Sequence, residues 1–225
     1  MNKQRYRFLS SAPDTGENNM ALDETLFLRA VGEKQPPCLR LYTWLSPCVT
    51  IGYFQKHGEF KAYGVPVIRR MTGGLGVRHG RDISYCFTAD ESSWPWVYDQ
   101  EKTYQLIHTA LRRGLQLLSF KAEFYSGFSA PSGLCVQTFF PYDLHIGGIK
   151  IVGSCQRRRG KTLLQQGSIH LPSQVDFDKA AQAIGQAMED ERNVILERST
   201  LTPEETATKN ELRLKYLSTE WNNKL

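Results

Sequence analysis

The sequence lacks the features that mark membrane-spanning, secreted and multidomain chains. No apolar run approaches the roughly 18 residues of a membrane span, and the N-terminal stretch has no apolar centre of a signal peptide. There is no internal repeat, no low-complexity tract and no Pro/Gly-rich linker. A chain of 225 residues can bury one core and is short for two. We therefore expect a cytoplasmic protein without a membrane partner, whose residues 1–225 form one domain.

Paired cysteines are also missing. The five cysteines are an odd, unclustered set without the CxxC spacing of a zinc site or redox pair, so we expect free thiols and no metal site. The net charge of +5 indicates an acidic partner only where the charge is concentrated. The obvious concentration is Arg157, Arg158 and Arg159, followed by Lys161.

Periodicity and capping residues predict an α+β fold. Four helices are expected: from Asp14, with Glu17 as its capping-box partner, to about Val31; from Lys102 to Leu118; from Asp176; and from Thr202 with Pro203 and Glu205. Runs rich in β-branched and aromatic residues predict strands at 39–44, 48–54, 65–70 and 83–89. Helices that flank a largely antiparallel sheet make an α+β domain.

A two-residue hairpin is predicted where Gly147 and Gly148 separate YDLHI from IKIVG. Adjacent glycines tolerate the positive φ angles of a type I′ turn. Counting outward from the turn gives these pairs: Ile146 with Ile149, His145 with Lys150, Leu144 with Ile151, and Asp143 with Val152. The aliphatic residues, Ile149 included, would then face the core.

Lys150 falls on the opposite, polar face of this hairpin, beside His145 and near Asp143. It is either a solvated surface lysine or a member of a functional cluster. Cys155 lies five residues further along, so a continuing strand would point it to the core side. A buried thiol there would behave as a small hydrophobe and need no further role.

A glycine-rich loop, RRMTGGLGVRHG at 69–80, joins two of the predicted strands. Adjacent glycines let the backbone approach a ligand closely and direct N–H groups at an anion or a carbonyl. The spacing fits neither the Walker nor the Rossmann pattern, and a Gly-Gly pair between strands is more often only a turn. The loop gains meaning in combination with other segments.

Four segments in order resemble the lipoate-protein ligase and octanoyltransferase family. They are NMALDE at 19–24, SPCVTIGYFQ at 46–55, the glycine loop, and YDLHIGGIKIVGSCQRRRGKTLLQQGSIHL at 142–171. LTPEE and KYLSTEW near the C-terminus extend the match over most of the chain. The resemblance implies the biotin/lipoate ligase fold: a mixed, largely antiparallel sheet flanked by helices, with a tunnel for a medium-chain acyl group.

The resemblance also assigns site residues. Lys150 corresponds to the family lysine of the GxKIxG segment, which favours the functional reading of that residue. The glycine loop and the strand after Lys150 would bind the substrate through Arg70, Thr72, Gly73, Gly74, Gly76, His79, Gly153, Ser154 and Gln156.

The family uses two chemistries, and the sequence favours one of them. Its ligases activate free lipoate with ATP and usually have three consecutive glycines in the loop and an Asn-Asp pair before the hairpin. This chain has Leu75 in place of the third glycine and Tyr142 in place of the asparagine. Octanoyltransferases of the cysteine type carry the nucleophile seven residues before a Tyr-Asp-Leu or Tyr-Glu-Leu triplet, where this chain has Cys135. An ATP-using ligase is the alternative, although we expect no accessory domain of the kind that many ligases carry.

Chemistry supports a cysteine here, because a thiolate is the best protein nucleophile toward a thioester and holds an acyl group without ATP. Lys150 would lower the pKa of Cys135 to about 7 or below and stabilise the oxyanion. Cys155 is the rival nucleophile, and an inert Cys135 is the plain alternative. We expect no cofactor; ATP and Mg²⁺ enter only if the ligase alternative holds.

The resemblance further implies partners. An acyl carrier protein would be the donor, and a lipoyl domain, either glycine cleavage H protein or a 2-oxoacid dehydrogenase E2, the acceptor. Arg157, Arg158 and Arg159 would dock the acidic carrier by charge-steered association. A non-catalytic scaffold whose arginine run binds an acidic partner is the alternative of another class. No nucleic-acid partner is expected, because the basic cluster is small and no aromatic stacking motif accompanies it.

Overall fold

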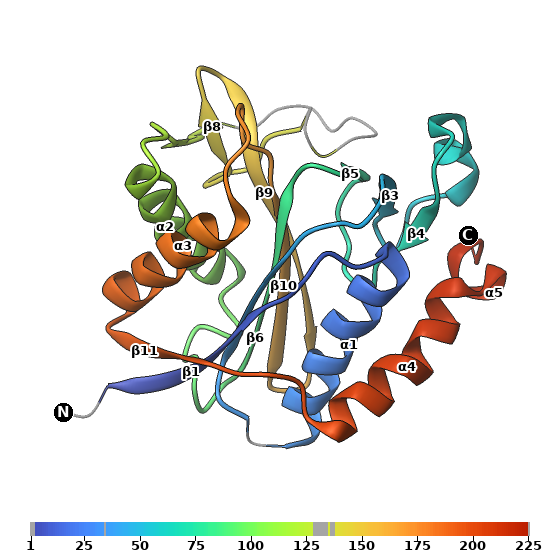
Figure 1. Ribbon diagram of the computed structural model, residues 1–225, viewed down its shortest axis with the longest axis horizontal. Helices are drawn as coiled ribbons and strands as arrows, with labels where there is room; N and C mark the ends of the chain where they lie inside the picture. Colours follow the sequence, from blue (N-terminus) through green and yellow to red (C-terminus); the bar gives the residue numbers. More distant parts are fainter. Residues whose placement is uncertain (1–2, 34, 128–134, 136–137, 225) are drawn as a thin grey trace.

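An eight-stranded mixed sheet forms the centre of the molecule in the computed structural model, which describes residues 3–33, 35–127, 135 and 138–224 (Figure 1). The strand order is β11-β1-β2-β6-β10-β9-β8-β7, and β1 runs parallel to both β11 and β2 while the other neighbours are antiparallel. The strands are β1 (Gln4–Ser10), β2 (Cys38–Tyr42), β6 (Ile83–Asp90), β7 (Glu123–Phe124), β8 (Leu144–Ile146), β9 (Ile149–Arg159), β10 (Thr162–Ile169) and β11 (Val194–Arg198).

A second, three-stranded sheet carries the glycine loop. Its order is β4-β3-β5, with β3 at Cys48–Ile51, β4 at Val67–Arg69 and β5 at Val77–His79. A 3₁₀ helix, η1 (His57–Tyr63), lies between β3 and β4 in the sequence. The two predicted strands at 39–44 and 48–54 therefore belong to different sheets, β2 to the large one and β3 to the small one.

Helices cover both faces of the large sheet (Figure 1). α2 (Gln100–Leu117) and α3 (Phe177–Arg192) pack together on one face, and α1 (Gly16–Gly32) and α4 (Pro203–Leu217), which α5 (Thr219–Asn222) follows, pack on the other. Apolar residues at helical spacing, such as Ile107, Leu111 and Ile184, enter the main core. Among the helices of the described ranges, none has an apolar stretch long enough to cross a bilayer. The expected fold class is confirmed.

Two of the four predicted helix starts are confirmed by their caps, and α2 begins two residues before the predicted Lys102, with Asp99 as its N-cap. Asp176 caps α3, and Thr202 forms a capping box with Glu205 at α4. The first helix starts differently: Thr15, not Asp14, is the N-cap and accepts a hydrogen bond from the Asn18 amide. The Asp14 carboxylate instead accepts from the Thr15 amide and the Asn18 side chain, because it lies one residue too early to reach the first turn's N3 amide.

The predicted hairpin exists, with Gly147 and Gly148 at φ 57° and 81°. His145 pairs with Lys150 as expected, but a bulge shifts the register so that Leu144 pairs with Val152 rather than Ile151.

The expected burial of the hairpin is wrong at two positions. Ile149 is 73% exposed, because the hairpin tip projects beyond the helices that cover the sheet (Figure 1). Lys150 is only 6% exposed, so it is not a residue of a solvated face. Its side chain folds back along β9 over Gly153, where a side chain is missing.

Candidate active site

Cys135 and Lys150 meet at a gap in β9 created by Gly153. A Cβ atom at Gly153 would lie 2.4 Å from Lys150 Cε, 2.7 Å from Lys150 Nζ and 3.2 Å from Cys135 Sγ. Glycine is therefore required for the ammonium and the thiol to occupy the same small volume. The Cys135 backbone N–H donates to Gly76 O at 2.9 Å, so the residue is held against the glycine loop.

The Lys150 ammonium is buried and paired. It donates to Asp143 Oδ2 at 2.6 Å and to the Thr138 carbonyl at 2.8 Å. The predicted neighbour Asp143 is thus confirmed, whereas the His145 ring accepts a hydrogen bond from the Gly148 amide instead. An ammonium has three donors, and within the described part of the chain two of them are engaged. The third N–H has no hydrogen-bond acceptor among the described residues.

The electrostatics of Cys135 differ from the expectation. Burial raises the pKa of the Cys135 thiol, while the Lys150 and Arg70 charges act in the lowering direction and Asp143 adds to the rise. The expectation that a neighbouring cation would bring this pKa to about 7 or below is wrong for this state. The physical reason is that the cation is shared with a carboxylate and the thiol is desolvated.

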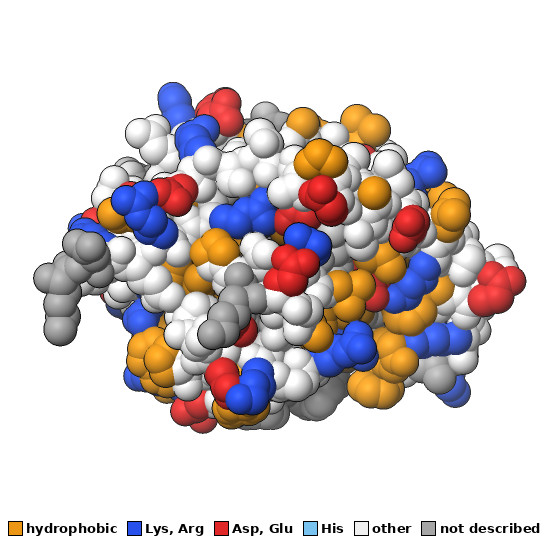
Figure 2. All heavy atoms as spheres, turned by 90° about the horizontal axis from the view of Figure 1, so that it is seen from below, with side chains coloured by type: hydrophobic (Ala, Val, Ile, Leu, Met, Phe, Trp, Pro, Cys, Tyr) orange, Lys and Arg blue, Asp and Glu red, His pale blue; other side chains and the backbone are white. Residues whose placement is uncertain are grey.

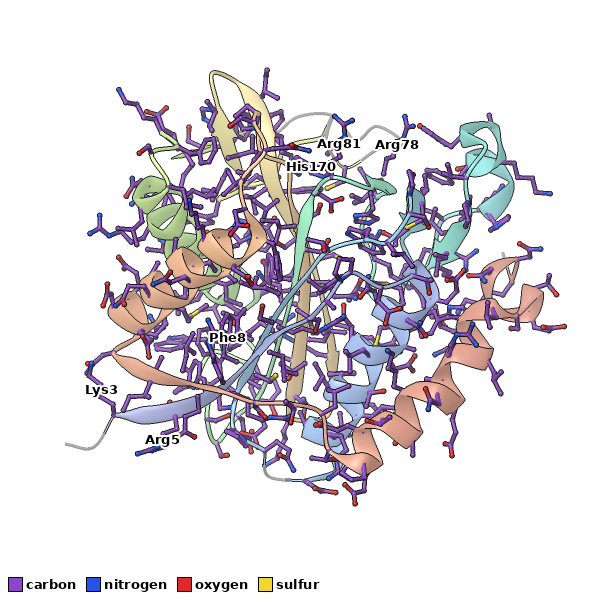
Figure 3. The ribbon with its side chains drawn as sticks, viewed as in Figure 1. Lys3, Arg5, Phe8, Arg78, Arg81 and His170 are labelled. Carbon is purple, nitrogen blue, oxygen red and sulfur yellow. The ribbon has the colours of Figure 1, made fainter. Side chains whose placement is uncertain are left out.

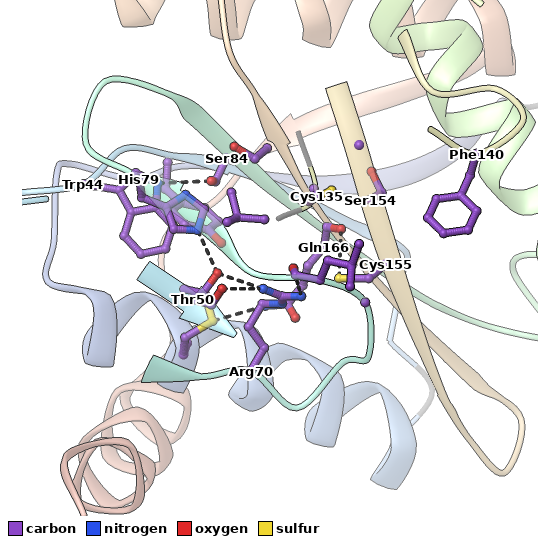
Figure 4. Close-up of a pocket in the computed structure, with 18 residues that line it drawn as sticks. Trp44, Thr50, Arg70, His79, Ser84, Cys135, Phe140, Ser154, Cys155 and Gln166 are labelled. Atoms are coloured by element: carbon purple, nitrogen blue, oxygen red, sulfur yellow. Dashed lines mark hydrogen bonds between the residues drawn. The ribbon is translucent and has the colours of Figure 1, made fainter. Parts of the chain in front are cut away.

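A cavity opens at Cys135 and extends between the small sheet and the large one (Figure 4). Trp44 and His79 stack at 3.9 Å between ring centroids at one end, and Cys135, Ser154 and Cys155 lie at the other. Its empty space, mouth included, is about 530 Å³. The remaining lining is largely apolar or hydroxyl-bearing and comprises Met20, Tyr42, Thr50, Arg70, Gly74, Leu75, Val77, Ser84, Phe140, Gly153, Gln166, Gly167 and Ser168.

Arg70 supports the glycine loop through hydrogen bonds to the loop backbone. The Arg70 guanidinium donates to the carbonyls of Thr50, Gly73 and Leu75 at 2.9–3.1 Å. Gly74 adopts φ 83° and Gly76 has no room for a side chain, because Phe60 lies 2.4 Å from its would-be Cβ. Arg70 therefore shapes the cavity wall, and its charge is engaged by the loop that it supports.

His79 is likewise anchored at the cavity wall. Its ring nitrogens lie 2.8 Å from Thr50 Oγ1 and 2.8 Å from Asp82 Oδ2. Burial would raise the pKa of Asp82. The charge and hydrogen bond of His79, with nearby hydroxyl groups, outweigh that effect and hold this pKa far below its usual value. This buried arrangement fixes the ring that stacks on Trp44.

Cys155 lies in the cavity wall, so the expectation of a core position is wrong. It is half-buried, and the side of β9 that carries it faces the glycine loop. Gln166 donates to Asp23, so its oxygen accepts the Thr72 hydroxyl proton at 2.8 Å. Cys155 Sγ lies 3.0 Å from Thr72 Oγ1, and its thiol donates to the Gln166 backbone carbonyl at 3.7 Å. Cys155 is therefore held by polar contacts with Thr72 and Gln166.

A second cavity adjoins the first at Gly74, Phe140, Ser154 and Cys155. Two predicted substrate residues, Gly73 and Gln156, line this second cavity rather than the one at Cys135. Its other walls come from the start of α2 and from the turn before β8, at Gln100, Glu101, Tyr104, Pro141 and Tyr142.

The three arginines do not form one surface beside Cys135. Arg157 donates to the Met71 carbonyl at 2.7 Å, whereas Arg158, on the opposite face of β9, donates to the Val97 carbonyl. Arg159 lies at the far end of β9, about 30 Å from Lys150 along an extended strand.

Several side chains at the site were not predicted from the sequence. Tyr104 and His108 of α2 contact the turn before β8, and Trp44, Thr50, Gln166 and Ser168 line the cavity. The available signal for the first two was a tyrosine and a histidine one helical turn apart beside the apolar stripe of α2.

Known proteins resemble this chain in sequence and in fold. Residues 15–205 match the family described as the lipoyl protein ligase A/B catalytic domain. Octanoyltransferase LipM of Kyrpidia tusciae is 30% identical over 270 residues, covering 97% of this chain and 98% of that protein. Octanoyltransferase LipM of Geobacillus kaustophilus is 32% identical over 275 residues, covering 99% of each.

Solved structures share the fold at lower identity. A protein of T. acidophilum with bound lipoic acid matches with a TM-score of 0.80 and 22% identity, covering 99% of this chain and 100% of that one. A lipoate-protein ligase A bound with ATP matches with a TM-score of 0.78 and 21% identity, covering 98% of each. Together with the match at 15–205 and the relatives at 30% identity or above, these findings establish that the chain belongs to the lipoyl protein ligase A/B catalytic domain family.

Proposed function

We propose that this chain is an octanoyltransferase that moves an octanoyl or lipoyl group from a carrier-protein thioester, through a Cys135 thioester, to a lysine of a lipoyl domain. The observation that carries the proposal is the meeting of the Cys135 thiol and the Lys150 ammonium at Gly153, at the mouth of a largely apolar cavity. The relatives' name, octanoyltransferase, supports the acyl class.

In the first step, the Cys135 thiolate attacks the carbonyl carbon of the donor thioester. A new S–C bond forms at Cys135, the donor C–S bond breaks, and the carrier sulfur leaves as a thiolate that takes up the proton lost by Cys135. The free N–H of Lys150 donates to the developing oxyanion. Exchange between two thioesters is close to isoenergetic, so the step needs no ATP.

In the second step, the amine of the acceptor lysine attacks the Cys135 thioester. A C–N bond forms, the S–C bond breaks, and the amine proton passes to the Cys135 sulfur, which restores the thiol. The acyl chain occupies the cavity between Cys135 and Trp44, and the adjoining cavity admits the donor and acceptor arms. Cys135 carries the acyl group rather than Cys155, because Cys135 lies beside the Lys150 ammonium at Gly153, whereas Cys155 contacts Thr72 and Gln166.

An acidic carrier is the donor in this proposal. Arg78 and Arg81 are exposed at the end of the molecule where the cavity opens, and neither forms an ion pair with the described residues (Figure 3). Arg78 stands between Val77 and His79, which both line the cavity. Of the three arginines predicted to dock the carrier, we retain Arg157, which lies beside the glycine loop.

The test is intact-protein mass spectrometry after mixing the chain with octanoyl-carrier protein, with and without MgATP. We expect one octanoyl adduct, labile to hydroxylamine and independent of MgATP. Cys135→Ser should lower adduct formation by at least about 1000-fold, as removal of a nucleophile does, while Cys155→Ala retains it. Transfer to a lipoyl domain that requires MgATP and free octanoate, with no adduct on the enzyme, supports the ligase alternative. Wild-type protein that forms no adduct and acylates no lipoyl domain with either donor supports the non-catalytic alternative.

A further inference from the structure

Two side chains of α2, one helical turn apart, connect β9 to the turn that carries Asp143. Tyr104 and His108 each contact Ser154 on β9, and each also contacts one residue of the pair Tyr142 and Asp143. We call Tyr104 and His108 the α2 clamp. Because the α2 clamp forms hydrogen bonds with both segments, it fixes the position of Asp143 relative to β9, the strand that bears Lys150.

The first arm of the clamp is Tyr104. Its hydroxyl oxygen accepts the Ser154 backbone N–H at 2.9 Å, and its proton is donated to Asp143 Oδ1 in a short contact. Burial and the Asp143 charge raise the pKa of Tyr104 well above its usual value, so the phenol stays a donor. The other oxygen of Asp143 accepts Lys150 Nζ at 2.6 Å and the Phe140 amide at 2.8 Å. Tyr104 and Lys150 therefore share one carboxylate between its two oxygens.

The second arm is His108, and its hydrogen bonds have a defined direction. Burial lowers the pKa of His108 to about 4, so the ring is neutral and carries one N–H. Nδ1 lies 2.8 Å from the Tyr142 carbonyl, which only accepts, so Nδ1 bears the proton. Nε2, 2.7 Å from Ser154 Oγ, then accepts from the serine hydroxyl.

The segment held by the clamp is strained. Tyr142 adopts φ 68°, a left-handed conformation that a bulky residue avoids unless its surroundings impose it. Its amide donates to Tyr125 O at 3.1 Å and its carbonyl accepts from His108, so both peptide groups are fixed. This strain aims the following residue, Asp143, at Lys150.

We propose that Tyr104 is a positioning residue for the acyl transfer: by holding Asp143 it keeps the Lys150 ammonium over Gly153, beside Cys135. The proposal rests on the proposed function for its catalytic meaning. Its structural content, the placement of Lys150 next to the thiol, can be measured on the free protein.

The test compares Tyr104→Phe with Tyr85→Phe. Tyr85 offers a matched control, because its hydroxyl is buried and contacts the same serine, Ser154 Oγ at 2.6 Å, but does not touch Asp143. We expect Tyr104→Phe to lower kcat for octanoyl loading from a small-molecule thioester by about 10- to 100-fold with KM within about threefold, by analogy with losses on removing outer-shell orienting groups. Tyr85→Phe should stay within about threefold of wild type.

A second readout does not depend on transfer. The rate of Cys135 alkylation by iodoacetamide is followed against pH in a variant that lacks the other cavity thiol, Cys155→Ala. Because Lys150 acts to lower the pKa of Cys135, loss of its placement should move the alkylation midpoint to higher pH in Tyr104→Phe and leave it unchanged in Tyr85→Phe. If wild-type protein forms no adduct, the proposed function fails while this profile still decides the positioning role.

Equal loss of kcat in the two variants, or an unchanged midpoint in a folded Tyr104→Phe protein, would overturn the proposal. Should Tyr104→Phe fail to fold, His108→Asn, which removes the other arm, carries the same two measurements. We then expect the same direction of change, and an unchanged midpoint there overturns the proposal as well.

Discussion

Two buried ion pairs in this molecule each join an aspartate to a basic side chain, in different surroundings. The side chains of Asp23 and Arg40 are 0% and 1% exposed and lie 2.6 Å apart, and those of Asp143 and Lys150 are 0% and 3% exposed, also 2.6 Å apart. Arg40 is enclosed by Ser11, the backbone and side-chain oxygens of Asn19 and the Tyr42 ring. Lys150 instead lies beside Cys135, where Gly153 lacks a side chain.

The difference teaches how to recognise a functional charge. Four of the five N–H groups of Arg40 have acceptors on Ser11, Asn19 and Asp23, so within the described residues this charge ties β2 to α1 and to the segment after β1. Two of the three N–H groups of Lys150 have acceptors there, and a thiol lies beside the ammonium. Burial and pairing alone do not distinguish the two pairs; the thiol beside the Lys150 cation does.

The strongest test of this comparison is Lys150→Ala against Arg40→Met. Each removes one member of a buried pair and leaves an unpaired carboxylate, so each should lower the free energy of unfolding by about 3–5 kcal/mol. For Lys150 this loss exceeds the roughly 1 kcal/mol that is typical of a surface substitution. Acyl transfer per folded molecule should fall by about 100-fold in Lys150→Ala and by less than a few fold in Arg40→Met.

Chemical denaturation and single-turnover loading of the folded fraction measure the two effects separately. A Lys150→Ala protein with wild-type loading would remove the distinction between the two pairs. The double variant Lys150→Ala/Asp143→Ala should recover part of the stability, because no buried charge is left alone, but none of the activity.

A second test concerns His108, the neutral histidine of α2 that contacts Ser154 and Tyr142 near Cys135 and Lys150. The pKa of His108 falls from 6.5 to about 4 on folding, so between these pH values the unfolded chain binds more protons. The free energy of unfolding should therefore decrease by about 3 kcal/mol as the pH is lowered from 6.5 to 4. His108→Gln should lose this part of the slope, measured by urea denaturation across that range. A slope identical to wild type would mean that His108 is not buried in its neutral form.

A side chain added at Gly153 should disturb the placement of Lys150 beside Cys135. In Gly153→Ala the new methyl group would lie 2.4 Å from Lys150 Cε, so the lysine must move. We expect octanoyl loading to fall by about tenfold or more, because small displacements of a catalytic group cost this much. Gly58→Ala, with nothing within 4 Å of the added atom, is the control and should load normally. Equal rates in both variants would show that Lys150 has room to spare.

The prediction with the smallest expected effect concerns exposed arginines that have no ion-pair partner among the described residues. Arg78 and Arg81 lack internal ion-pair partners within the described ranges and flank the cavity end of the molecule, whereas Lys3 and Arg5 lie at the opposite end (Figure 3). Arg78→Glu/Arg81→Glu should raise KM for an octanoyl-carrier protein several-fold at low salt, and less at high salt. Lys3→Glu/Arg5→Glu should not. A small-molecule thioester serves as the uncharged reference substrate, and an equal KM change for it would argue against docking.

Elsewhere on the molecule, surface charge by itself does not indicate a docking site. In the view from below, basic and apolar side chains mix over the end of the molecule where Figure 1 places α4 and α5 (Figure 2). Leu214 of α4 is 66% exposed there. No described residue of α4 or α5 lines the cavity at Cys135.

Much of the fold followed from local sequence. The capping box at Thr202 and the hairpin at Gly147 and Gly148 were predictable, because a cap or a tight turn involves residues within four positions of each other. β1, β10 and β11 were not foreseen. β10 is buried along nearly its whole length and carries Gln165 and Gln166 in its middle, so it shows no alternation of apolar and polar residues.

The site was only half predictable for the same reason. The spacing of Cys135 from Tyr142, Asp143 and Leu144, and the family match of Lys150, predicted from the sequence the two groups that the structure brings together at Gly153. Cys155 was placed in the core because strand periodicity says which residues share a face, but not which face meets a loop from elsewhere in the chain.

The sequence by itself determined the secondary-structure classes, the family and the residue types available for acyl transfer, because these depend on local periodicity and on motifs read in order. Only the tertiary structure decided that Lys150 is buried against Asp143, that Gly153 leaves space for Cys135, and that α2 reaches this site through Tyr104. A one-residue bulge in β8 and the packing of α2 on β9 set those contacts, and both depend on residues brought together from distant parts of the chain.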